Sequence, residues 1–256
     1  MTREPVSPTR KMYIARLFGR ILILAICTCI YFFRPEMLNI LHGSNFFAAP
    51  SVFHLLWVLW ILDMLYQIIP IGSYISMGSE KIFKKRFKPI KEKLNSKALK
   101  AHIISTTKAA YRVFIIWIAL LAVIGRLYYK NILTAKELFM ITVIFYVCDL
   151  ICVLIWCPFR LIMKNRCCTT CRIFNWDHLM MFTPMMFIPG FFPKSLLCMS
   201  LLVFILWELC VLTYPERFWE NSNMALKCSE CTDKLCTQYC RKLRRQGLKS
   251  LSDKKK

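Results

Sequence analysis

The chain has 256 residues, of which 57% are hydrophobic when aromatic residues and Cys are counted, and its mean hydropathy is +0.46. This composition excludes a disordered chain, a collagen-like repeat and a small disulfide-stapled domain. The charge is strongly positive, with 36 Lys and Arg against 14 Asp and Glu. Basic residues between long apolar runs are typical of membrane topology, so we predict an all-α integral membrane protein and expect no nucleic-acid partner.

Six apolar segments predict a bundle of about six transmembrane helices, because a bilayer core about 30 Å thick needs about 20 apolar residues per helix. The segments are 15–33, 52–71, 111–129, 137–156, 179–192 and 195–214. Arg16 and Arg20 begin the first segment, and we expect their long side chains to reach the membrane interface. The fifth segment is short and contains Pro184 and Pro189, so it either crosses the membrane or re-enters it.

The distribution of charge favours six crossings. Of the 36 Lys and Arg, 31 fall in the four segments that an internal N-terminus makes cytoplasmic: 1–20, 72–112, 157–178 and 215–256. Positive charge is retained on the cytoplasmic side. We therefore predict cytoplasmic N and C termini, in a membrane that we expect to be the bacterial inner membrane. The predicted parts are a basic N-terminus, a membrane domain and a basic Cys-rich tail, over 1–14, 15–214 and 215–256.

The cytoplasmic loop 72–110 mixes apolar and basic side chains. Phe83 and Phe87 alternate with Lys and Arg, a pattern typical of an amphipathic stretch that lies on a membrane surface. We expect this stretch to contact the anionic lipids of the cytoplasmic leaflet. Pro89 prevents it from forming one continuous helix.

Eight of the 14 Cys fall in two groups on the predicted cytoplasmic side, where the reducing compartment disfavours structural disulfides. The first group is Cys157, Cys167, Cys168 and Cys171, and the second is Cys228, Cys231, Cys236 and Cys240. Each contains a C-x2-C pair, which directs two thiolates to one ion, and each has the four ligands of a tetrahedral site. We predict that the groups bind zinc or an iron–sulfur cluster.

Other roles for the cysteines stay open. Reduced thiols without a ligand are one alternative, and S-acylation of Cys167 and Cys168 at the membrane edge is another. Asp177 or His178 is a further ligand candidate for the first group. The six remaining cysteines are expected to be small buried apolar residues: Cys27, Cys29, Cys148, Cys152, Cys198 and Cys210.

Three acids lie inside predicted spans. Asp63, Asp149 and Glu208 stand at one depth in the second, fourth and sixth spans. An intramembrane acid is costly and faces the interior of a bundle. The three either line a path for cations or protons, or form hydrogen bonds that hold helices together. The alternative function is thus a transporter of a small solute or cation, with the Cys groups structural.

The sequence contains no motif of a known catalytic site, such as a Walker loop or an H-E-x-x-H zinc motif. Catalytic residues are therefore unknown, and enzyme activity is undecided. The polar run 175–178 before the fifth segment is either a helix cap or a carboxylate–imidazole pair beside Cys171. The leading hypothesis is a membrane protein whose cytoplasmic cysteines bind metal, with iron–sulfur electron transfer as its redox form.

Overall fold

The computed structural model of the chain describes residues 7–69, 77–90, 95–165, 167–233 and 235. Regular structure in these ranges is helical, without a β-strand, which confirms the all-α prediction. Within them, four helices are long and apolar enough to cross a membrane: α1 (Pro8–Phe33), α4 (Ser96–Tyr129), α5 (Ala135–Leu154) and α8 (Phe191–Thr213). The shorter α2 (Val52–Ile68) is also apolar.

Side-chain caps determine where these helices begin. Ser7 caps α1 by accepting a hydrogen bond from the Arg10 amide, and Pro8 fits the first turn. Asn95 caps α4, which therefore starts 15 residues before its predicted span. His54 completes a capping box with Ser51 at the start of α2.

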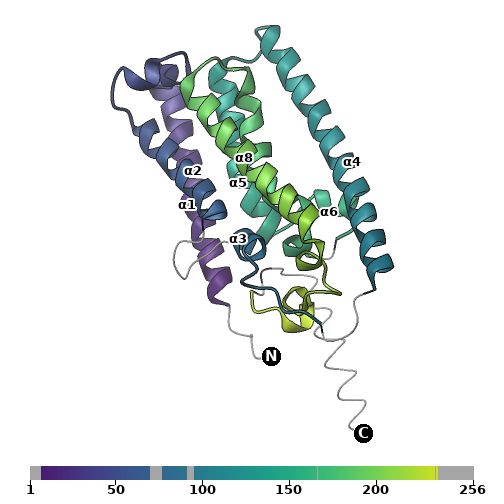
Figure 1. Cartoon of the computed structure of the whole chain (residues 1–256). Coiled ribbons are helices and arrows are strands. Elements are labelled where there is room, and N and C mark those ends of the chain that lie inside the picture. Colours follow the sequence, from purple (N-terminus) through teal and green to yellow (C-terminus); the bar gives the residue numbers. More distant parts are fainter. Residues whose placement is uncertain (1–6, 70–76, 91–94, 166, 234, 236–256) are drawn as a thin grey trace.

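The long helices form a bundle in which α1 packs along α5, and α2 along α8 (Figure 1). The short α7 (Asp177–Phe182) packs between α5 and α8. In contrast, α4 stands at the edge of the bundle and makes its main contacts with α6 (Phe159–Met163) and η5 (Thr183–Phe187).

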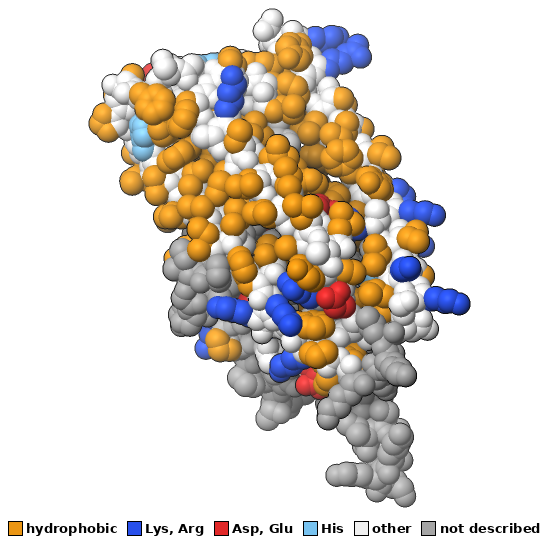
Figure 2. Space-filling model, viewed as in Figure 1, with side chains coloured by type: hydrophobic (Ala, Val, Ile, Leu, Met, Phe, Trp, Pro, Cys, Tyr) orange, Lys and Arg blue, Asp and Glu red, His pale blue; other side chains and the backbone are white. Residues whose placement is uncertain are grey.

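Apolar side chains cover the outside of the long helices (Figure 2). Leu22 of α1, Leu55 of α2, Ile115 of α4 and Leu209 of α8 are all more than half exposed. A water-soluble protein rarely exposes a continuous apolar surface of this kind, whereas a bilayer requires one. The helices and their apolar surface thus agree with a multi-pass membrane protein.

The predicted fifth span is an irregular segment made of α7, η5 and the residues that follow. It ends beside the α1–α2 connection, which contains η1 (Pro35–Leu41) and η2 (Asn45–Phe47). There the Gly43 amide donates to the Pro189 carbonyl at 2.7 Å, and the Phe191 amide donates to the Gly43 carbonyl at 3.1 Å. A Cβ atom on Gly190 would lie 2.1 Å from the Leu41 carbonyl oxygen, so only glycine permits this contact.

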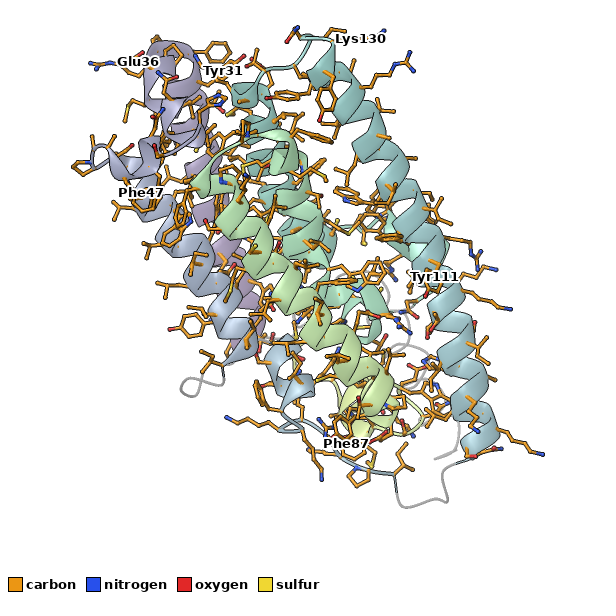
Figure 3. All side chains as sticks on the ribbon, turned by 45° about the horizontal axis from the view of Figure 1, so that its top comes forward. Tyr31, Glu36, Phe47, Phe87, Tyr111 and Lys130 are labelled. Carbon is orange, nitrogen blue, oxygen red and sulfur yellow. The ribbon has the colours of Figure 1, made fainter. Side chains whose placement is uncertain are left out.

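Figure 3 places Tyr31, Glu36 and Lys130 at this same end, and Phe87 at the opposite one. At the opposite end, Ser7 Oγ donates a hydrogen bond to the carbonyl of Asp233, so the first and last described parts of the chain meet. Short helices collect there: α3 (Met77–Ile82), α6, η3 (Cys168–Thr170), η4 (Arg172–Asn175), η6 (Pro215–Arg217), η7 (Met224–Leu226) and η8 (Cys228–Glu230).

The basic loop is not one amphipathic helix. After α3 the chain passes through turns, and Pro89 forms a bridge with Asn223 of the tail. The Met224 amide donates to the Lys88 carbonyl at 2.9 Å, which strengthens this pairing. The loop therefore packs partly against the tail of the same chain.

Candidate functional site

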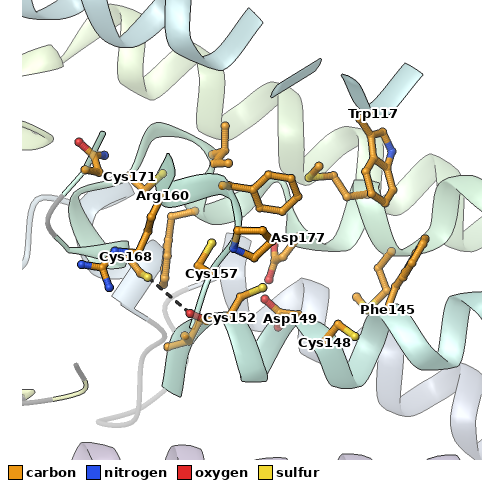
Figure 4. A pocket seen from close by; sticks show the side chains of 18 of the residues that line it. Trp117, Phe145, Cys148, Asp149, Cys152, Cys157, Arg160, Cys168, Cys171 and Asp177 are labelled. Carbon is orange, nitrogen blue, oxygen red and sulfur yellow. Dashed lines mark hydrogen bonds between the residues drawn. The ribbon is translucent and has the colours of Figure 1, made fainter. Parts of the chain in front are cut away.

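A cavity of about 260 Å³ lies between α4, α5, α6 and α7. Trp117 and Phe145 line its deeper part, and Asn165 lines the part beyond the end of α5. Six cysteines face this cavity (Figure 4): Cys148, Cys152, Cys157, Cys167, Cys168 and Cys171. The structure thus brings the first predicted Cys group together and adds two cysteines of α5 that the sequence had left as apolar residues.

Cys157 is the central thiol of the cavity. The Cys152 and Cys168 thiols donate hydrogen bonds to its sulfur, and these bonds hold the pKa of Cys157 well below its usual range. The same bond raises the pKa of Cys168. Cys168 Sγ also lies 3.6 Å from the Cys152 carbonyl oxygen, so its single hydrogen is shared between this oxygen and the Cys157 sulfur. A thiolate between two thiols is suited to binding metal and to nucleophilic attack, because the thiolate is the reactive form of cysteine.

The backbone around Cys157 explains why these thiols meet. Helix α5 ends at Leu154, and Pro158 cannot continue it because proline lacks an amide hydrogen. The chain turns through α6, which ends where Lys164 adopts a left-handed φ of 52°. It then returns to the end of α5, where Cys168 packs near Cys152.

The C-x2-C pair forms a tight turn. The Cys171 amide donates to the Cys168 carbonyl at 2.9 Å, and Thr170 Oγ1 donates to the Cys167 carbonyl at 2.9 Å. Burial raises the pKa of Cys171 to about 11, so this thiol is protonated at neutral pH. Cys167 Sγ shares a hydrogen bond with Thr169 Oγ1 at 3.0 Å. The four predicted ligands of the first group thus line one cavity, but their side chains have different hydrogen-bond partners.

Arg172, directly after the C-x2-C pair, fixes this turn to α8. Its guanidinium donates to Glu208 at 2.6 and 3.2 Å, and the Trp176 indole donates to the other Glu208 oxygen at 2.8 Å. Arg172 also donates to Thr107 of α4, and its carbonyl accepts from Trp207. Both oxygens of Glu208 are therefore occupied in holding the cysteine turn.

The other two intramembrane acids meet elsewhere. Arg20 of α1 is 6% exposed and lies 2.6 Å from Asp149 and 3.3 Å from Asp63. Its guanidinium also stacks 4.0 Å from the centre of the Tyr146 ring. The expectation that Arg20 reaches the membrane interface is therefore wrong, because two buried carboxylates hold it inside the bundle.

His178 extends this network. Its imidazole is 1% exposed and lies 3.4 Å from Asp63 and 3.2 Å from Asp177, and it is hydrogen bonded to Gln67 at 3.1 Å. We call Arg20, Asp63, Asp149, Asp177 and His178 the ion network. Its Asp149 and Asp177 also line the cavity, so the network adjoins the thiols. His178 itself faces the network and is not among the residues that line the cavity.

The second Cys group is described only in part, since Cys236 and Cys240 lie outside the described residues. Cys228 and Cys231 flank η8 and are partly buried. Two residues further on, Asp233 forms a two-pronged ion pair with Arg86, at 2.5 and 2.7 Å. This pair holds the tail against the basic loop.

Lys81 of α3 lies near the first group and is 3% exposed. Burial lowers its pKa to about 8, and Cys167, Cys171 and Asp233 are among the groups that act on its charge. Its ammonium faces the rings of Phe174 and Trp207, at 5.2 and 5.8 Å. In the described part of the chain, no carboxylate lies within 4 Å of it.

A formed metal site is absent from the described residues: no three or more His, Cys, Asp and Glu side chains meet in a group that could hold an ion. Comparison of the chain with protein-family models, curated proteins and solved structures gave no match. Function is therefore inferred from the residues of the cavity alone.

Proposed function

We propose that the protein is a multi-pass membrane protein that binds a metal ion through cysteine thiolates at its cytoplasmic side. The observation that carries the proposal is the hydrogen-bonded trio of Cys152, Cys157 and Cys168. Thiolates are the ligands that thiophilic metals prefer. In this trio a metal ion would replace the protons that now link the sulfur atoms, and binding would release those protons.

The ligand set in this proposal differs from the predicted one. Cys152 joins Cys157 and Cys168, and Cys171 is the nearest candidate for a fourth ligand because it shares the C-x2-C turn. Zinc and iron–sulfur clusters usually take four protein ligands, so either requires the Cys171 side chain to turn toward Cys157. The second group, with Cys228 and Cys231, is proposed as a separate thiolate site.

The proposed topology has six crossings and cytoplasmic termini. It is supported by the charge distribution and by the contact of Gly43 with Pro189, at the end of the bundle opposite Ser7 and Asp233. A bacterial inner membrane is part of the proposal. Reporter fusions after Tyr129 and after Tyr214 should report outside and inside, respectively, and an external C-terminus would contradict this topology.

Metal analysis tests the proposed function. Protein purified without oxygen should contain a thiophilic metal ion or cluster in the cavity, and Cys157→Ser should remove this metal without removing metal bound by the separate tail site. Cys198→Ser is the matched control, because Cys198 is exposed on α8 and does not line the cavity. A brown, iron- and sulfide-containing protein selects electron transfer, whereas colourless zinc selects a structural site. Metal-free protein in which Cys157 reacts freely with thiol reagents would falsify the proposal.

Cation transport is the second candidate function, favoured because Asp149 belongs to the ion network and also lines the cavity. Since Glu208 is occupied by Arg172 and Trp176, the proposed path runs through Asp63 and Asp149. In membrane vesicles, Asp63→Asn with Asp149→Asn should abolish cation flux and leave insertion intact. Unchanged flux in this variant would exclude the path.

A further inference from the structure

Sulfur-containing side chains are numerous around the cavity. Six cysteine thiols and two methionine thioethers line it, from α5, the turn between α5 and α6, the segment after α6, and α7. Cys148 and Cys152 lie one turn apart on α5, and Met180 and Met181 line the same cavity from α7, which packs against α5. Soft sulfur atoms are therefore not confined to the Cys157 trio but continue toward the middle of the membrane domain.

Few oxygen ligands reach the cavity, and its two carboxylates lie beside cationic partners. Asp149 accepts from Arg20 at 2.6 Å, and Asp177 lies 3.2 Å from the His178 imidazole. Hard cations such as Mg²⁺ and Ca²⁺ need several oxygen ligands, which this cavity does not offer. Thiolates and thioethers instead select soft ions, of which Cu⁺ is the biological example.

The charge beside the cavity is compatible with a monovalent ion. A Cu⁺ ion between two thiolates forms a complex with one net negative charge, and buried charge is stable only when it is compensated. Lys81 supplies a buried positive charge beside Cys167 and Cys171. The Lys81 ammonium lies over the rings of Phe174 and Trp207. Since an ammonium group has no lone pair, it contributes charge and does not act as a ligand.

We propose that the cavity binds a soft monovalent metal ion of the Cu⁺ class, and that Cys148, Met180 and Met181 form a second, deeper sulfur position next to the Cys157 trio. This inference rests on the proposed thiolate function and narrows its metal. Two sulfur positions in one apolar cavity give the ion a path between the cytoplasmic end of the bundle and the membrane interior. No change in oxidation state is involved, because the ion enters and leaves as Cu⁺.

A titration with Cu⁺ in competition with a coloured Cu⁺ chelator tests this assignment on the full chain in detergent, without oxygen. The double variant Met180→Leu, Met181→Leu keeps side-chain volume but removes both thioethers. It should weaken retention of Cu⁺ at least tenfold, or lower the stoichiometry by one ion. Met186→Leu is the matched control, because Met186 lies on η5, is 53% exposed and does not line the cavity.

The outcomes separate this inference from the proposed function. Loss of Cu⁺ in the double variant, with unchanged thermal unfolding and unchanged zinc binding, supports the thioether position. Equal Cu⁺ retention in the double variant and the Met186→Leu control overturns it. If zinc or iron binds at Cys157 while Cu⁺ does not, the inference fails and the proposed function stands. If none of the three metals binds, both fail.

Discussion

The ion network and the thiol cavity lie side by side on α5, yet they are built in opposite ways. Arg20 contacts two carboxylates, a backbone carbonyl and an aromatic ring, so its charge is compensated on all sides. The cavity is empty of protein atoms, and beside it the sulfur of Cys157 accepts hydrogen bonds from the thiols of Cys152 and Cys168. The buried charge of Arg20 and its partners thus holds helices of this bundle together, whereas the thiols beside the cavity are left accessible to a ligand.

Removing the central cation of the ion network should have the largest effect. Arg20→Met leaves Asp63 and Asp149 buried without a partner, a loss of about 3–5 kcal/mol of stability for a buried pair. Thermal unfolding in detergent measures it. Arg16→Met is the control, because Arg16 is exposed on the same helix and forms no ion pair in the described residues.

A combined variant sharpens this test. Adding Asp63→Asn and Asp149→Asn to Arg20→Met removes the unpaired charges, so part of the lost stability should return. If Arg20→Met and Arg16→Met unfold at the same temperature, the ion network does not hold the bundle together.

A smaller loss of stability is expected at the ion pair of Arg172 and Glu208, which lies beside the cysteine turn. Glu208→Gln leaves Arg172 without its carboxylate, and because the neutral amide oxygen can still accept a hydrogen bond from the guanidinium we expect a loss of about 2–3 kcal/mol. The cysteine turn should also loosen, so Cys168 should be alkylated faster, as measured by mass spectrometry. Glu36→Gln, at an exposed position, should change neither quantity. Unaltered alkylation in Glu208→Gln would show that Arg172 does not position the turn.

The smallest expected effect concerns the cavity alone. It is a difference between the rates at which Cys157 and Cys171 are alkylated as pH changes. Because the pKa of Cys157 is lowered, it should remain a thiolate and react with iodoacetamide at pH 6. Burial raises the pKa of Cys171 to about 11, so its reaction should stay slow at pH 6 and increase only as pH rises above 9. Peptide mapping follows both sites. Identical pH profiles for the two cysteines would remove the basis for a central thiolate.

The sequence predicted the parts of the fold that depend on local pattern. Apolar runs predicted the four long helices, since length and composition alone decide whether a helix can cross a bilayer. Pro184 and Pro189 indicated that 177–190 would be irregular, because proline interrupts helical hydrogen bonds. The start of α4 at Ser96 was missed, because its basic first half does not follow the rule for membrane spans.

The candidate site was predicted less completely, because pairing across helices leaves no local signal. Cys152 was taken as a buried apolar residue, although its spacing of five from Cys157 spans the end of α5. Arg20 and Asp149 are 129 positions apart, and their pairing depends on how α1 and α5 pack. Glu208 was predicted to lie at the same membrane depth as Asp63 and Asp149. Depth alone does not show which neighbour a side chain faces, so the pairing of Glu208 with Arg172 was missed.

X-ray absorption at the metal edge tests the central claim most directly, because it counts the sulfur atoms around a bound metal. For wild-type protein loaded without oxygen, the account expects a shell of sulfur scatterers at about 2.3 Å, the length of a metal–thiolate bond to zinc. Cys152→Ser should remove one sulfur from that shell, and Cys198→Ser should remove none. A shell of oxygen or nitrogen, or a sulfur shell that Cys152→Ser leaves intact, would contradict the proposed thiol site.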